Sequence, residues 1–286
     1  TGGSNTAVGR SALEKNTTGS NNTAIGNLAL DAQTTVNNNT AIGHAALTAN
    51  TTGTPNTAVG AFAGQSITEG ANTTLLGFAA GDAITTANDN TYIGHNAGTA
   101  NTSGASNTGV GSAVLAANTT GTSNSAVGSL ALDANTTGFQ NTAVGYLSMS
   151  ANTTASNNTS LGYNSLGLNT TGTQNTAVGS QSLLNNTTGQ SNTAVGYQAA
   201  KSITTGSYNT VIGELALLDN TTGQANTALG RAALFDNTEG NNNTSVGYNS
   251  LLLNTTGSFN VAVGASALDA NVTSSSNTAI GYNSLT

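Results

Sequence analysis

The sequence predicts an all-β fold, a parallel β-solenoid of about 17 coils in which each coil is one repeat of period 17. One glycine marks the repeat: from Gly9 to Gly26 and onward it recurs at the same spacing, without an insertion or a deletion. A unit of this length is too short for two helices and their turns, and it is rich in Gly, Asn and Thr, which are poor helix formers. The marker glycines are Gly9, Gly26, Gly43, Gly60, Gly77, Gly94, Gly111, Gly128, Gly145, Gly162, Gly179, Gly196, Gly213, Gly230, Gly247, Gly264 and Gly281.

Each coil is expected to contain two short strands and two corners. The consensus NTAVGxxALxxNTTGxx places strand-favouring Thr and Val before the marker glycine, and turn-favouring Asn and Gly at the corners. In the first coil these elements are a strand at 6–8, a corner at Gly9, a second strand at 11–13 and a corner at 16–19. A one-residue insertion would turn every following strand side chain to the other face, which explains the constant period. With strands about 4.8 Å apart, 17 coils would make a rod of about 80 Å.

Two columns of stacked residues are predicted to form the core. The aliphatic column, directly before the marker glycine, is Val, Ile or Leu in every coil and begins with Val8. The leucine column, four residues after the glycine, begins with Leu13. Because strand side chains alternate, the alanine column that begins with Ala7 is expected to face away from Val8. Two roles stay open for it: contact with another chain, or packing at a tight inner corner.

Four coils lack a large residue in the leucine column. The replacements are Gly64, Gly81, Gly98 and Ala200. In three of these coils an isoleucine replaces an asparagine three residues later, at Ile67, Ile84 and Ile203. This exchange is expected to conserve volume inside a close-packed coil. The coil of Gly98 keeps Asn101, so the exchange does not explain it.

Two columns of asparagine are predicted to run along the stack. The first asparagine column begins with Asn16 and the second with Asn5. Stacked amides would bond to one another and to corner backbone groups. The first column is also written as N-glycosylation sequons, so glycan attachment is an alternative role. The candidate attachment sites are Asn16, Asn50, Asn101, Asn118, Asn135, Asn152, Asn169, Asn186, Asn220, Asn254 and Asn271.

The fifth and sixth positions after the marker glycine form a corner that should face water, because most charged residues lie there. Between about 184 and 253 several residues at these positions are apolar instead, and exposed apolar patches often mark interfaces. The candidate interface residues are Leu184, Leu218, Phe235, Leu252 and Leu253. The position directly after the marker glycine carries a broken tyrosine column, for which plain corner packing is favoured over contact with sugars or partner chains. Its members are Tyr146, Tyr163, Tyr197, Tyr248 and Tyr282.

The sequence offers no candidate catalytic, cofactor-binding or metal-binding residues. His44 and His95 share a column but lie three coils apart, about 14 Å, so they cannot share a metal. No carboxylate pair, Ser-His-Asp set or phosphate-binding loop stands out. The net charge of −7, with four scattered cations, opposes nucleic-acid binding. No apolar run of about 18 residues would insert into a membrane. We therefore expect a protein that is not an enzyme.

The motif resembles repeats of bacterial and phage tail-fibre-like surface proteins. The residues that carry the resemblance are NTAVGxxAL with NTTG, and the variant forms AGQSITEGANTTLLG at 63–77 and AAKSITTGSYNTVIG at 199–213. The motif is also similar in style to the head repeats of trimeric autotransporter adhesins, although that repeat is shorter than the repeat of this chain. The resemblance implies an extracellular, cell-surface or virion-fibre location, with copies of the chain and surface glycans as partners.

The leading hypothesis is a structural extracellular fibre or adhesin stalk. It would be one solenoid domain over residues 1–286, uncapped at both ends, that forms filaments by head-to-tail stacking or by lateral or trimeric association. A phage or phage-like tail-fibre shaft is one alternative. Ice binding is another, because Thr17 and Thr18 begin two neighbouring threonine columns. Neighbours along a strand point to opposite faces, however, so these two columns would not share one flat face. A carbohydrate-processing solenoid would need an acidic cluster that is missing.

Overall fold

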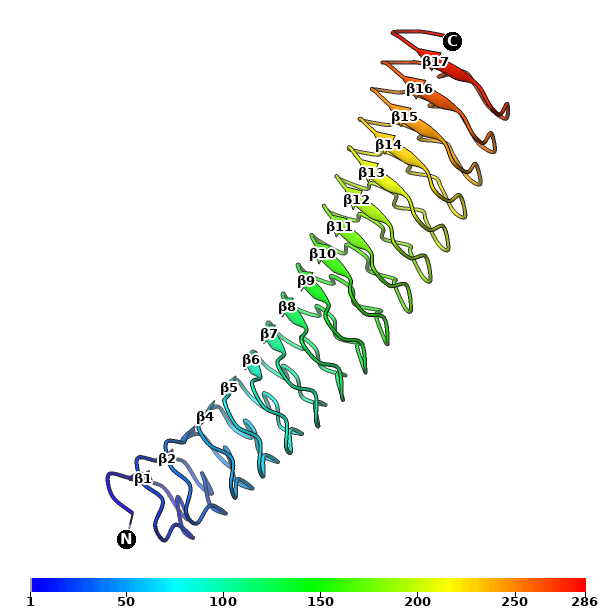
Figure 1. Cartoon of the computed structure of the whole chain (residues 1–286). Helices are drawn as coiled ribbons and strands as arrows, with labels where there is room; N and C mark the ends of the chain where they lie inside the picture. Colours follow the sequence, from blue (N-terminus) through cyan, green and yellow to red (C-terminus); the bar gives the residue numbers. More distant parts are fainter. Residues whose placement is uncertain (1) are drawn as a thin grey trace. The chain divides into compact units, whose positions relative to one another are not determined.

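The computed structural model describes residues 2–286, which form short parallel strands joined by turns and bends, without a helix. The strands are β1 (Thr6–Val8), β2 (Thr23–Ile25), β3 (Thr40–Ile42), β4 (Asn56–Val59), β5 (Thr73–Leu76), β6 (Thr91–Ile93), β7 (Thr108–Val110), β8 (Ser125–Val127), β9 (Thr142–Val144), β10 (Thr159–Leu161), β11 (Thr176–Val178), β12 (Thr193–Val195), β13 (Thr210–Ile212), β14 (Thr227–Leu229), β15 (Thr244–Val246), β16 (Val261–Val263) and β17 (Thr278–Ile280). The chain divides into two compact units, Thr1–Asn141 with β1–β8 and Thr142–Thr286 with β9–β17. Each unit is a solenoid of successive coils (Figure 1).

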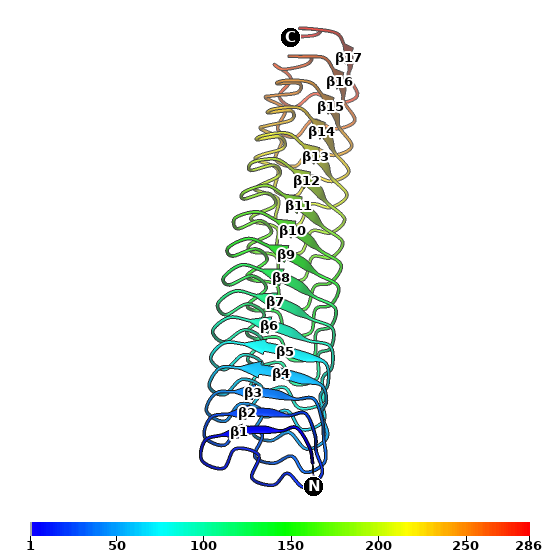
Figure 2. The ribbon, with the colours of Figure 1, turned by 90° about the vertical axis from the view of Figure 1, so that its left-hand side faces the viewer.

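Within each unit, every strand pairs in parallel with the next strand in the sequence. In the first unit Thr23 lies opposite Thr40, and in the second Thr176 lies opposite Thr193. Figure 2 shows the strands of each unit stacked one above another. Residues one repeat apart in the sequence therefore lie directly over one another. This confirms the predicted fold class, a parallel β-solenoid in which each coil is one repeat of the sequence.

The alanine column, and not the aliphatic column, lines the interior of the coils. Ala24 and Ala41 are 0% exposed, whereas Ile25 and Ile42 are each 37% exposed. The prediction that the aliphatic column forms the core was therefore wrong, and the inner role for alanine is the correct one. Only one of two neighbouring strand residues can face inward. Because each coil is short, the interior opposite the leucine column has room in most coils for no side chain larger than a methyl group.

The leucine column forms the second part of the core, as predicted, but its backbone is a turn and not a strand. Leu30 and Leu47 are fully buried. The φ angles of Leu28 and Leu30 are 61° and 50°, which is the left-handed region and excludes an extended strand. The turn is nevertheless bonded to the next coil, since the Leu30 N–H donates to the Ala46 carbonyl at 3.1 Å.

The marker glycine is required by both backbone conformation and space. Gly196 has a φ of 138°, which residues with a side chain rarely adopt. A Cβ placed on Gly196 would lie 2.5 Å from the carbonyl oxygen of Gly213 in the next coil. The same positive φ recurs along the column, and the same close approach recurs at the marker glycines that have a further coil beside them, such as Gly179 and Gly213, but not at Gly281.

Large side chains fill the coils that lack leucine, as the predicted volume exchange requires. A Cβ placed on Gly81 would lie 2.8 Å from both Ile84 Cδ1 and Leu75 Cδ2. The coil of Gly98, which the isoleucine exchange left unexplained, is filled by Tyr92 from the alanine column. A Cβ on Gly98 would lie 2.5 Å from Tyr92 Cε2, and burial raises the pKa of this tyrosine.

Candidate functional site

The second asparagine column, which is interrupted at Thr73, ties most coils to the next through buried amides. The Asn226 backbone N–H donates to Asn209 Oδ1 at 3.0 Å, and Asn209 Nδ2 donates to the Gly223 carbonyl at 3.0 Å. Asn209 is fully buried, so both halves of its amide serve the backbone without competition from water. The predicted asparagine ladder is confirmed here.

The first asparagine column lies inside the coil as well. Asn118 Nδ2 donates to Asn101 Oδ1 at 3.2 Å and to the Gly121 carbonyl at 3.1 Å. Of the eleven sequon asparagines, only Asn16 and Asn271 in the outermost coils are partly exposed, while the other nine are fully buried. A glycan is attached to this amide nitrogen. Attachment at the nine buried positions would therefore require the coil to open.

The candidate interface residues form an apolar corner on the second unit. We call the five residues Leu184, Leu218, Phe235, Leu252 and Leu253 the apolar corner. Leu253 is 43% exposed and the other four are half-buried. Leu168, 49% exposed, lies six residues after Gly162 and extends the same corner, although sequence reasoning missed it. Asp236 follows Phe235, and burial together with the neighbouring Asp219 raises the pKa of its carboxyl.

The tyrosine column lies on the surface instead of packing into a corner, because its rings are about half-exposed or more. Tyr146 and Tyr163 stack with their ring centroids 6.0 Å apart, and the Arg231 guanidinium lies over the Tyr248 ring at 5.7 Å. The first unit carries an equivalent aromatic row. It consists of His44, Phe62, Phe78 and His95, with neighbouring centroids 5.1, 5.7 and 5.5 Å apart.

The outward surface of the strands carries two regular columns. One is the aliphatic column, and the other is the strand threonine column, three residues before the marker glycine, which begins with Thr6. In β13, Thr210 and Ile212 are exposed on either side of the buried Val211. Neither column contains a charged residue. From the sequence, paired threonines were considered only in the columns that begin with Thr17 and Thr18, where one flat face was rejected, so this surface was overlooked.

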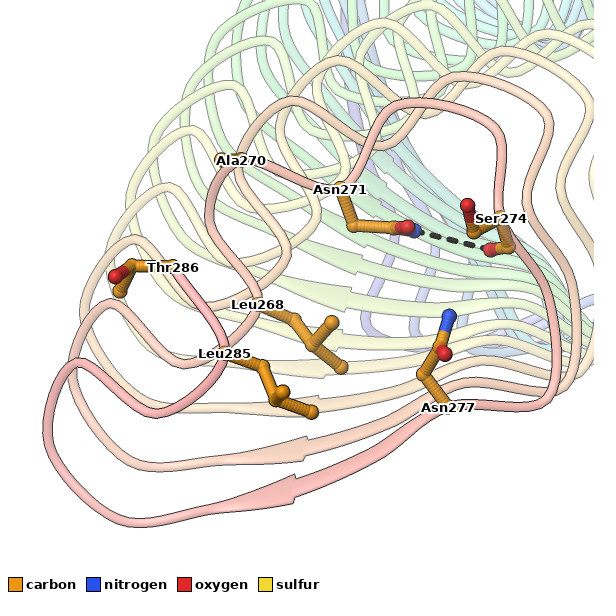
Figure 3. Close-up of a pocket in the computed structure, with 7 residues that line it drawn as sticks. All are labelled: Leu268, Ala270, Asn271, Ser274, Asn277, Leu285 and Thr286. Atoms are coloured by element: carbon orange, nitrogen blue, oxygen red, sulfur yellow. Dashed lines mark hydrogen bonds between the residues drawn. The ribbon is translucent and has the colours of Figure 1, made fainter.

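The structure shows a pocket at the last coil. Its volume is about 270 Å³, and it is lined by Leu268, Ala270, Asn271, Ser274, Asn277, Leu285 and Thr286. Figure 3 shows Leu268 and Leu285 side by side, with Asn271 Nδ2 donating to the Ser274 carbonyl at 3.0 Å. Five of these residues, Leu268, Asn271, Ser274, Asn277 and Leu285, belong to columns that form the interior of other coils, so the pocket is the open face of the last coil.

Residues 2–286 contain neither a cluster of metal ligands nor a membrane-spanning helix. No three His, Cys, Asp or Glu side chains lie close enough together to hold a metal ion in this range. The same range contains no helix with the length and hydrophobicity needed to cross a membrane. Comparison with models of known protein families, with curated proteins and with solved structures found no match to the chain.

Proposed function

We propose that this protein is a structural, non-catalytic component of an extracellular fibre or adhesin stalk, in which copies of the chain associate. The observation that carries the proposal is the double column of buried asparagine, which links most coils to their neighbours along each unit. Such a column makes the displacement of one coil costly, because buried amides would lose their partners. Stiffness along the stack is the property that a stalk requires.

Backbone hydrogen bonds support the same proposal, because they join neighbouring coils on three sides. The strand side bonds through the register described above. The leucine turn bonds through pairs such as Leu183 N–H to the Ala199 carbonyl, at 3.1 Å. The threonine corner bonds through Thr187 N–H to the Thr204 carbonyl, at 2.9 Å. A stack bonded on three sides resists bending and offers proteases little free backbone.

We assign lateral association between copies to the apolar corner. Charged residues are the minority in this corner: between Leu184 and Leu253 they are Lys201, Asp219 and Asp236. Burial of exposed leucine and phenylalanine surface is favourable, by about 25 cal/mol per Å² of apolar area. Association of two or three copies along this corner would remove it from water.

Analytical ultracentrifugation and electron microscopy of the full chain test this proposal. We expect oligomers or filaments, and we expect Leu253→Lys to shift them toward single chains. Leu229→Lys is the matched control, because Leu229 is also 43% exposed but lies on the strand face. A wild-type chain that stays a single particle at all concentrations would contradict the association. Antibody labelling of cells and of virions then separates a stalk from a tail-fibre shaft.

A further inference from the structure

The strand face is a two-column array that the stalk proposal does not use. The strand threonine column holds threonine in every coil except at Ser125 and Val261. The aliphatic column beside it holds Val, Ile or Leu in every coil. Both columns point outward, since the alanine column between them is buried. Each coil except that of Val261 thus presents one hydroxyl group and one branched aliphatic group at fixed positions.

The hydroxyl groups of this face are free, whereas those of the corner threonine column are not. In the column that begins with Thr17, hydroxyls such as those of Thr187 and Thr204 donate to carbonyls of the next coil at 3.0 and 3.1 Å. In the strand threonine column, hydroxyls such as that of Thr210 make no hydrogen bond to any described residue. These hydroxyls therefore keep their full capacity to bond outside the chain.

The spacing of the array follows from strand geometry. Along the stack, equivalent groups repeat every ~4.8 Å, the distance between paired strands. Across each strand, Thr and the aliphatic residue two positions later are ~6.7 Å apart. In-register pairing such as Thr193 opposite Thr210, and Val195 opposite Ile212, keeps this lattice aligned from coil to coil. The oxygen atoms on crystal faces of ice repeat at similar distances.

We propose that the strand face orders water and adsorbs to ice. The threonine hydroxyls would bond to water molecules held at lattice positions, and the methyl groups of both columns would fit between them. This binding site goes beyond the proposed stalk function and does not depend on it. Thr18 begins another threonine column, but that column is single and is interrupted by Glu69 and Glu239, so it offers no equivalent lattice.

A second copy of the chain is the main competing occupant of this face. A dry interface would bury one unpaired hydroxyl group in nearly every coil, and burial without a hydrogen-bond partner is unfavourable. An ice surface supplies both donors and acceptors to every hydroxyl. The free hydroxyls therefore favour ordered water over another protein chain.

Thermal hysteresis and ice-recrystallisation assays on the full chain test the proposal. We expect the wild type to be active and the triple variant Thr193→Lys, Thr210→Lys, Thr227→Lys to lose the activity, because lysine side chains break the lattice over three coils. The matched control changes three exposed threonines of the single column in neighbouring coils: Thr188→Lys, Thr205→Lys and Thr222→Lys. This control should keep the activity. Circular dichroism shows whether both variants are folded.

The outcomes separate this inference from the stalk proposal. Leu229→Lys should reduce ice adsorption but leave assembly unchanged, and Leu253→Lys should do the reverse. Absence of ice activity in the wild type would overturn the inference, as would equal losses in the two triple variants. Dissociation of an oligomer by the strand-face variant, without any ice activity, would assign the face to a second copy instead.

Discussion

At the scale of single residues, the marker glycine is the position least able to change. Gly179 has a φ of 129°, and a Cβ there would lie 2.4 Å from the Gly196 carbonyl oxygen. We expect Gly179→Ala to lower the free energy of unfolding by at least about 1–3 kcal/mol, the usual cost of such backbone strain. Gly281→Ala is the control, because Gly281 has a φ of 125° but open space where the Cβ would lie. Chemical denaturation should show a smaller loss for it, and equal losses would mean that the clash contributes nothing.

Asp236 makes stability depend on pH. Burial and, secondly, the charge of Asp219 raise the pKa of Asp236 above its ordinary 3.8. The folded chain therefore holds this proton at pH values where the unfolded chain has released it, so stability falls as pH rises through the folded pKa. We expect Asp236→Asn to raise the free energy of unfolding at neutral pH but to have less effect near pH 3. Denaturation at both pH values measures this. The exposed Glu239→Gln should show a smaller difference, and a pH-independent effect of Asp236→Asn would refute the assignment.

The sequence predicted which columns exist but not which of them face inward. Val8 and Ala7 are neighbours in a strand, and apolarity alone favoured the larger one for the core. The large residues that replace alanine at some places in the alanine column could have shown that this column faces the core. Leu75, Tyr92 and Val211 enlarge it near coils whose leucine column is empty or reduced. Such an exchange of volume occurs only between side chains that share one interior.

At the scale of one coil, the same exchange of volume can be tested directly. Leu234→Ala should cost about 2–5 kcal/mol, because it empties the fully buried leucine position. Asn237→Ile alone should also destabilise the chain, since it removes hydrogen bonds of 2.8 and 3.0 Å to Asn220 and Gly240. Combined, the two changes recreate the natural pairing of a small residue with isoleucine. We expect the double variant to lose less stability than the two single losses added together.

A double-mutant cycle by chemical denaturation measures this coupling. An interaction energy of about 0.5–3 kcal/mol is typical of residues in contact. The control pair is Leu217→Ala with Asn254→Ile, which lie two coils apart and should be additive. Additivity in the first pair as well would show that the isoleucine does not fill the space of the leucine.

The turn that carries the leucine column shows why the second strand was predicted wrongly. Alternating residues such as Ser11 and Leu13 satisfy a strand pattern, but both have a φ of 55°. The alternation of residue types in the sequence cannot distinguish a strand from a turn in which every second residue has a left-handed backbone conformation. Gly64 and Gly98 occupy the leucine position with φ angles of 58° and 60°. These glycines therefore indicated a left-handed backbone conformation at this position, as well as the loss of a large side chain.

At the scale of the whole molecule, the repeat makes each unit nearly one-dimensional. A coil contacts the coils before and after it, so stability should be a sum over coils and their neighbours. The in-register pairs of β9–β17 all join positions one repeat apart, from Thr142 opposite Thr159 to Val261 opposite Thr278. Chain length can therefore change by a whole period without disturbing a column, but by no other amount.

Deletion of residues 193–209 removes one period and joins Asn192 to Thr210, which restores the Asn-Thr sequence at the junction. We expect this variant to fold cooperatively with a modest loss of stability. Deletion of 193–208 is one residue shorter, and it would place a second asparagine where the strand threonine belongs. Every later strand would then have to turn its inner face outward or bulge. Thermal unfolding followed by circular dichroism should show a low or absent transition for this shorter deletion. Similar transitions for the two variants would mean that the strands can change their register relative to the preceding coils without loss of stability. The buried asparagine amides, which have fixed partners in the neighbouring coil, should not permit such a shift.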